Sequence, residues 1–98
     1  MLKEERVLGF EWDEEKATIN FRKHGIAFKT ATRVFQDENR LVIYDDEHSR
    51  DEDRYITIGK VKNMLFVIYV ERAENIRIIS ARLATKKEKE MYYGNSIL

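Results

Sequence analysis

Four arginines and one histidine carry most of the chemistry that this sequence offers. The candidate catalytic residues are His48, Arg54, Arg72, Arg77 and Arg82. A guanidinium group keeps its charge at physiological pH, and its planar fork matches the oxygens of a phosphate. His48 follows a run of three carboxylates, which favour the protonated ring and make it a candidate proton donor. The set is therefore typical of a site that binds a phosphate group and moves a proton.

A structural role for the same residues is the alternative. A charge within a sheet must be paired or face a groove, because an unpaired buried charge is too costly. The acids nearest to the arginines in the sequence are Glu71, Glu74 and Glu88. The acidic run around His48 can likewise be an ordinary solvated loop. The sequence leaves both alternatives open.

A second set of residues suits the backbone and bases of RNA. The candidate RNA-binding residues are Lys23, Lys86, Lys87 and Tyr92. Lysines on the last helix can steer a phosphate backbone, and an aromatic ring can stack on a base. Tyr92 can instead pack the last helix onto the sheet.

No metal or other cofactor is predicted. The acidic loop lacks the glycine and the ligand spacing of an EF-hand, and the two histidines do not stand at ligand spacing. The absence of cysteine excludes thiolate sites and disulfides. His24 closes a helix on its apolar side, where a structural role is expected.

Length and charge bound the kind of protein. The 98 residues predict a single domain, residues 1–98, with one modest core. Net charge is zero, but residues 1–52 hold 9 basic and 13 acidic side chains, whereas residues 53–98 hold 9 and 5. The second half could therefore meet an anion or an acidic partner, but for these segment totals we favour the alternative that the charges fall on solvated faces. No apolar run approaches the roughly 20 residues of a membrane span, so we expect a cytoplasmic protein with no membrane association.

The elements that must position these residues follow the order β-α-α-β-β-β-β-α. The predicted strands cover residues 7–13, 41–46, 54–61, 63–72 and 76–84, and the predicted helices cover 14–24, 27–37 and 85–94. Asp13 caps the first helix, Gly25 ends it, Thr85 and Glu88 form a capping box, and Gly94 ends the last helix. Short turns make the last four strands an antiparallel meander. The fold class is α+β: two N-terminal helices pack on a twisted antiparallel sheet of about four strands plus a short N-terminal strand, followed by a C-terminal helix.

Strict alternation along the final strand separates its two arginines. It places Arg82 on the face of Ile76 and Ile78, and Arg77 on the opposite face. Arg72, at the end of the preceding strand, is expected close to Arg77.

Three stretches resemble the BrnT family, the toxin half of a bacterial type II toxin–antitoxin pair. They are FEWDEEKATINFRKHGIAF, DDEHSRDEDRYITIG and ERAENIRIISARLATKKEKEMYYG, which together run from Phe10 to Gly94. The resemblance implies a RelE-like fold and a ribonuclease activity that arrests translation without a metal. It also implies a BrnA-like antitoxin partner that neutralises the toxin and carries the DNA-binding function, so that operator DNA is bound only through the complex. All five candidate catalytic residues, with Lys23 and Tyr92, match the pattern of the family.

Two functions from different classes follow. The first is an endoribonuclease that uses the 2′-hydroxyl of RNA as nucleophile, on free or ribosome-associated RNA, with the arginines stabilising the phosphorane and His48 as acid or base. Lys23 and Glu88 are further candidates for proton transfer. The second is a non-catalytic component that binds the antitoxin and assists operator binding. The neutral net charge, where many relatives look basic, predicts modest affinity for RNA away from the ribosome.

Overall fold

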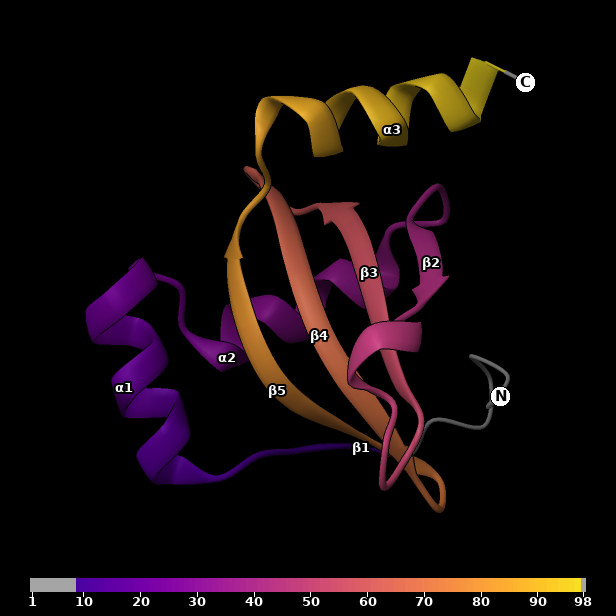
Figure 1. Cartoon of the computed structure of the whole chain (residues 1–98). Coiled ribbons are helices and arrows are strands. Elements are labelled where there is room, and N and C mark those ends of the chain that lie inside the picture. Colours follow the sequence, from indigo (N-terminus) through magenta and orange to yellow (C-terminus); the bar gives the residue numbers. More distant parts are fainter. Residues whose placement is uncertain (1–8, 98) are drawn as a thin grey trace.

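A five-stranded sheet with helices on both faces forms the protein (Figure 1). The computed structural model describes residues 9–97. The strands are β1 (Gly9–Glu11), β2 (Leu41–Tyr44), β3 (Arg54–Lys60), β4 (Met64–Arg72) and β5 (Asn75–Leu83). The α-helices are α1 (Glu14–His24), α2 (Phe28–Ala31) and α3 (Lys86–Ile97), and the 3₁₀ helices are η2 (Thr32–Gln36) and η3 (Asp46–His48). The predicted order of elements is confirmed.

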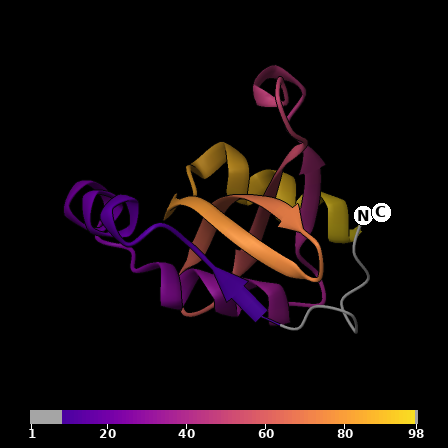
Figure 2. The same ribbon diagram turned by 90° about the horizontal axis from the view of Figure 1, so that it is seen from below.

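The strand order is β1-β5-β4-β3-β2, and the last four strands in the sequence form the predicted antiparallel meander. The sheet as a whole is mixed, because β1 pairs in parallel with β5. The chain leaves β1 at one edge, runs through α1 and α2, and returns to the opposite edge at β2 (Figure 2). This crossing was not predicted, since no local signal fixes the direction of a three-residue strand.

The main core lies between the sheet and the segment formed by α2 and η2. Phe28, Ala31 and Val34 of this segment are buried against β4 and β5. The sheet residues in this core are Leu65, Val67, Tyr69, Ile76, Ile78 and Ala81. The expected second helix is thus present, but it tightens into a 3₁₀ turn after Ala31.

Within residues 9–97, the opposite face of the sheet is covered at one end only. There α3 packs Tyr92 against a smaller cluster formed by Ile58, Met64 and Ala84. At the other end of this face, the η3 loop projects from the sheet (Figure 2). We call this side the open face.

All four candidate arginines lie on the open face, and a bulge in β5 brings Arg82 to the face of Arg77. Ser80 pairs with Ile68 but Ile78 pairs with Tyr69, so Ile79 is an extra residue. Residues paired across neighbouring strands lie on the same face of a sheet. Val70 pairs with both Arg54 and Arg77, and Phe66 pairs with Arg82. Phe66, Val70 and Arg72 are separated by even numbers of residues along β4, so they also share one face. The expectation that Arg77 and Arg82 lie on opposite faces is therefore wrong, because the bulge resets the alternation.

Local signals account for most helix ends. Asp13 accepts a hydrogen bond from the Lys16 amide at 3.1 Å, and Gly25 ends α1 with φ of 73°. Thr85 and Glu88 exchange both capping-box hydrogen bonds, at 2.8 and 3.2 Å. The predicted stop at Gly94 is wrong, since α3 continues to Ile97. No helix in residues 9–97 has the length and apolar character needed to cross a bilayer.

Candidate functional site

The η3 loop holds His48 in a fixed orientation. Its Nδ1 lies 3.1 Å from both carboxylate oxygens of Asp45, a residue only 8% exposed. An ionised carboxylate can only accept, so Nδ1 carries the proton and donates it. The Nε2 atom has no partner within residues 9–97, and the side chain is 58% exposed. A histidine oriented by a carboxylate through one nitrogen, with the other nitrogen available, is equipped for proton transfer.

Ser49 ties this loop to the start of β3. Its hydroxyl donates to the Asp45 carbonyl at 2.6 Å and accepts from the Arg54 amide at 2.8 Å. The Asp45 amide also donates to the Arg54 carbonyl at 2.9 Å. These three bonds fix the position of His48 relative to Arg54, although the loop stands at the surface.

Arg54 and His48 line one polar pocket of about 320 Å³, which we call the His48 pocket. Its lining residues are Glu47, His48, Arg50, Asp51, Glu52 and Arg54. As a residue Arg54 is partly buried, and its guanidinium makes no ion pair or hydrogen bond to any residue in the described part of the chain. An unpaired cation in the same pocket as an oriented imidazole is suited to a phosphate oxygen.

Two further arginines lie next to this pocket but are already paired. Arg72 forms a two-pronged contact of 3.2 Å with Glu52, and Arg77 binds Glu11 at 2.9 Å. Through Val70, Arg77 lies in the same cross-strand row as Arg54, about 10 Å away at the backbone. The hydrogen bond from Arg77 lowers the pKa of Glu11, and the charge of Arg72 also contributes to this shift.

Arg82 is separated from the other candidates. It pairs with Phe66, which is four residues along β4 from Val70, the partner of Arg77, so Arg82 lies about 13 Å from Arg77 along the sheet. Its guanidinium binds both oxygens of Glu88, at 2.8 and 2.9 Å, and lies 3.8 Å from the centre of the Phe66 ring. The hydrogen bond between them raises the pKa of Arg82 and lowers that of Glu88. Arg82 thus fastens α3 to the sheet.

The ion-pair alternative therefore holds for three of the four arginines. Arg82 pairs with Glu88, one of the three acids expected as partners. Arg72 and Arg77 pair with Glu52 and Glu11, and not with Glu71 or Glu74 as expected. Glu11 is 66 residues from Arg77 in the sequence, so only the parallel pairing of β1 with β5 brings them together. Arg54 alone keeps the expected availability for an anion.

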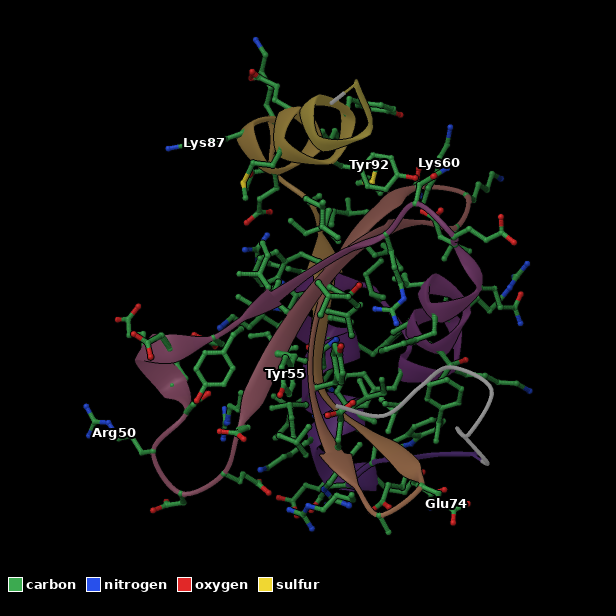
Figure 3. The ribbon with its side chains drawn as sticks, turned by 90° about the vertical axis from the view of Figure 1, so that its right-hand side faces the viewer. Arg50, Tyr55, Lys60, Glu74, Lys87 and Tyr92 are labelled. Atoms are coloured by element: carbon green, nitrogen blue, oxygen red, sulfur yellow. The ribbon has the colours of Figure 1, made fainter. Side chains whose placement is uncertain are left out.

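None of the candidate RNA-binding residues is among the residues that line the His48 pocket. Lys23 lies exposed at the end of α1, and Lys86 and Lys87 lie exposed on α3, where Lys87 extends sideways from the helix, on the same side of the view as Arg50 (Figure 3). Tyr92 is buried at 6% exposure and its hydroxyl donates to Asp37 at 2.7 Å. Burial, with this hydrogen bond, raises the pKa of Tyr92 to about 12. Stacking of a base on Tyr92 is excluded by its burial, and the packing alternative is confirmed.

Glu52 is a member of the pocket that the sequence reasoning did not select as catalytic. It lines the pocket with His48 and contacts Arg72. A carboxylate two residues before Arg54, at the start of a strand, is the signal that could have identified it.

The other candidates for proton transfer, Lys23 and Glu88, lie on α1 and α3, outside this pocket. Residues 9–97 contain no group of three histidine or acidic side chains that could hold a metal ion.

Comparison with known proteins agrees with the resemblance in the sequence. Residues 12–88 match the family model described as the ribonuclease toxin BrnT of type II toxin–antitoxin systems. The fold is similar to the 1.1 Å crystal structure of the Brucella abortus ribonuclease toxin BrnT, with a TM-score of 0.63 and 26% identity, over 80% of this chain and 97% of that chain. Curated protein sequences gave no match. Because the family model spans most of the chain, the protein belongs to the BrnT family of ribonuclease toxins of type II toxin–antitoxin systems.

Proposed function

We propose that the chain is an endoribonuclease whose active site is the His48 pocket, where it cleaves RNA without a metal and so arrests translation and growth. The single observation that carries this proposal is that the unpaired guanidinium of Arg54 and the oriented ring of His48 belong to residues lining one pocket. Phosphate binding and proton transfer need these two groups within one pocket. Membership of the family supports the choice of RNA as the target.

The reaction is a transesterification that balances within the RNA. The 2′-oxygen attacks the adjacent phosphorus while the bond from phosphorus to the 5′-oxygen breaks. One group takes the proton of the 2′-hydroxyl and a second gives a proton to the leaving 5′-oxygen. The products are a 2′,3′-cyclic phosphate and a 5′-hydroxyl. The attacking oxygen belongs to the substrate, so this route needs no bound metal to supply the nucleophile.

The groups of the pocket divide these tasks. Protonated His48, held through Nδ1, presents Nε2 as the acid, and the carboxylate of Glu52 serves as the base. Arg54 stabilises the charge that develops on the phosphorane. Arg72 and Arg77 add positive potential at the margin, and the exposed pair between Arg72 and Glu52 can open at little cost when a phosphate arrives.

Growth arrest tests the proposal in cells. Arg54→Ala should remove one charge-stabilising donor, with a loss of about 10²–10³-fold in cleavage rate. His48→Ala should remove general acid–base help of about 10²–10⁴-fold. Both variants should therefore lose toxicity, whereas Arg22→Ala, a matched change of an exposed arginine on α1, should stay toxic. Full toxicity of Arg54→Ala at equal expression would reject the site.

A second function is favoured by one observation. Arg72, Arg77 and Arg82 are engaged in ion pairs within the fold, as expected if they serve the structure of a non-catalytic component that acts in antitoxin binding and autoregulation. Expression of this chain alone separates the two functions. Intact cellular RNA and normal growth would favour the binding component.

Membership of the family implies an antitoxin partner. We further propose that this partner is a BrnA-like antitoxin that neutralises the toxin in the cytoplasm, and that operator DNA is bound only through the complex. Co-purification with the product of the adjacent reading frame, followed by loss of RNA cleavage on mixing, would test the pairing.

A further inference from the structure

A second, larger pocket lies at the far end of the sheet from His48. It has a volume of about 760 Å³ and lies between η2, the β3–β4 turn and α3. Six of its lining residues carry the argument: Arg33, Gln36, Asn39, Lys60, Lys62 and Tyr93. We call it the distal basic pocket. Lys60 stands at the opposite end of β3 from Arg54, about 20 Å away, and Figure 3 shows Lys60 and Arg50 on opposite sides of the molecule.

Three cations from three different segments converge on this pocket. Arg33 comes from η2, Lys60 from the end of β3, and Lys62 from the turn that follows. All three are exposed, and none makes a side-chain ion pair or hydrogen bond within the described residues. Such a grouping of unpaired like charges is unfavourable in the free protein and becomes favourable when an anion binds between them.

Among the described residues that line the pocket, the one carboxylate, Asp37, is occupied by hydrogen bonds within the fold. Asp37 accepts hydrogen bonds from the amides of Asn39 and Lys60, at 2.9 and 2.8 Å, and from the Tyr92 hydroxyl at 2.7 Å. Partial burial opposes its ionisation, but these hydrogen bonds outweigh burial and lower its pKa. Asp37 therefore stabilises the segments that form the pocket, and it forms no ion pair with the three cations.

An aromatic ring and two amides give the pocket features beyond charge. Tyr93 is 49% exposed, and its ring is held edge-to-face against Tyr92 with centroids 5.1 Å apart. A held, half-exposed ring provides a plane on which an unstacked base can lie. The exposed amide side chains of Gln36 and Asn39 can donate to and accept from the edge of a base.

We propose that the distal basic pocket binds a single-stranded segment of the RNA substrate away from the cleaved bond. This inference rests on the proposed nuclease function. An acidic peptide would use the three cations, but it would leave the ring and the amides without a role. A single strand uses all three kinds of group, because phosphates meet the cations and a base meets Tyr93.

Binding to an RNA that cannot be cleaved tests the pocket by itself. The probe is a 2′-O-methyl oligoribonucleotide of about 12 nucleotides, within the range that single-strand binding folds cover. Its affinity for the full chain is measured by fluorescence anisotropy over a series of salt concentrations. The double variant Lys60→Ala/Lys62→Ala should bind more weakly and lower the slope of log K against log salt by about 1.4, since each phosphate contact contributes about 0.7. The charge-matched control Lys16→Ala/Lys29→Ala should keep the wild-type slope.

The aromatic ring gives an independent readout. Tyr93→Ala should weaken binding by about 5- to 150-fold and leave the salt slope unchanged, because a stacking contact releases no counterions. Unchanged affinity in both the lysine and the tyrosine variants would overturn the inference. So would tighter binding of poly-glutamate than of RNA, which would assign the pocket to an acidic protein segment. Failure of the nuclease proposal is distinct, since it would appear as unaltered RNA cleavage by Arg54→Ala.

Discussion

At the scale of single residues, the geometry of the His48 pocket depends on one hydroxyl group. Ser49 is the only side chain in the described part of the chain that bonds both the Asp45 carbonyl and the Arg54 amide. The proposed mechanism gives Ser49 no contact with the phosphate and no proton to transfer. We therefore regard Ser49 as a positioning residue.

Ser49→Ala should lower kcat far more than it raises KM. A displacement of about 1 Å between reacting groups can cost about 10²-fold in rate. Ser49→Thr keeps the hydroxyl and should restore most of the activity. Steady-state kinetics of the two variants check this prediction. A purely structural role would lower the thermal midpoint of Ser49→Ala without changing kcat of the folded fraction.

A second residue-scale feature joins α1 to the sheet. Asn20 is buried, donates from Nδ2 to the carbonyls of Ala81 and Ile26 at 2.8 and 3.1 Å, and accepts from the Ala81 amide at 3.1 Å. Asn20→Ala should lower the free energy of unfolding by about 1–3 kcal/mol for each group left buried without a partner. Lys16→Ala, an exposed change on the same helix, serves as control in denaturant unfolding. Equal stability of the two variants would contradict this role.

The residues that could be predicted are those whose partners are close in the sequence. Asp13, Gly25 and the pair Thr85–Glu88 each act within one turn of a helix, so their types and spacing suffice. The pairs Arg72–Glu52 and Arg77–Glu11 span 20 and 66 residues, and only the assembled sheet creates them. For the same reason Arg54 could not be distinguished from the paired arginines.

At the scale of elements, the Arg82–Glu88 pair sets the attachment of α3 to the sheet. The pair lies on the open face, next to Phe66, and combines with the capping box of Thr85. Its loss should release the first turn of α3 and with it the packing of Tyr92.

Glu88→Gln should destabilise the protein by about 1–2 kcal/mol at pH 7, because a hydrogen-bonded charge pair that is partly exposed is lost. The hydrogen bond from Arg82 lowers the pKa of Glu88 from 4.5, so the folded state binds this proton less well than the unfolded chain. The stabilisation is then complete above pH 4.5 and is lost as the pH falls through the lowered pKa. Unfolding of wild type and variant from pH 7 to pH 3 should show a difference that shrinks in acid. A difference independent of pH would contradict the assignment.

The bulge in β5 is the element that sequence periodicity missed. Alternation holds from Ile76 to Ile78 and resumes at Ala81 with the opposite phase. No glycine or other local signal stands at Ile79, and the extra residue is accommodated only against β4. A one-residue shift moves every following side chain to the other face, which is why Arg82 was placed wrongly.

At the scale of the whole molecule, the acidic first half and the basic second half of the chain meet in the sheet. Glu11 and Glu52 belong to the first half, and their partners Arg77 and Arg72 belong to the second. These two ion pairs match two of the four excess charges on each half of the chain. The meander could be predicted because its turns are short, whereas the parallel edge strand and the two polar pockets depend on contacts between distant segments.

The positions of these two pockets suggest a path for RNA over the molecule. The His48 pocket and the distal basic pocket lie at opposite ends of β3, and α3 stands beside the second. A strand held at both ends would be fixed for cleavage without the strongly basic surface that binds nucleic acid indiscriminately.

The most direct test of the central claim is the cleavage of a short RNA of defined sequence by the purified chain, with the ends of the products identified. We expect a 2′,3′-cyclic phosphate and a 5′-hydroxyl, no cleavage when the 2′-hydroxyl at the cut site is methylated, and a rate about 10²–10³-fold lower for Arg54→Ala than for Arg22→Ala. Products with a 5′-phosphate, or an Arg54→Ala rate equal to that of Arg22→Ala, would contradict the account.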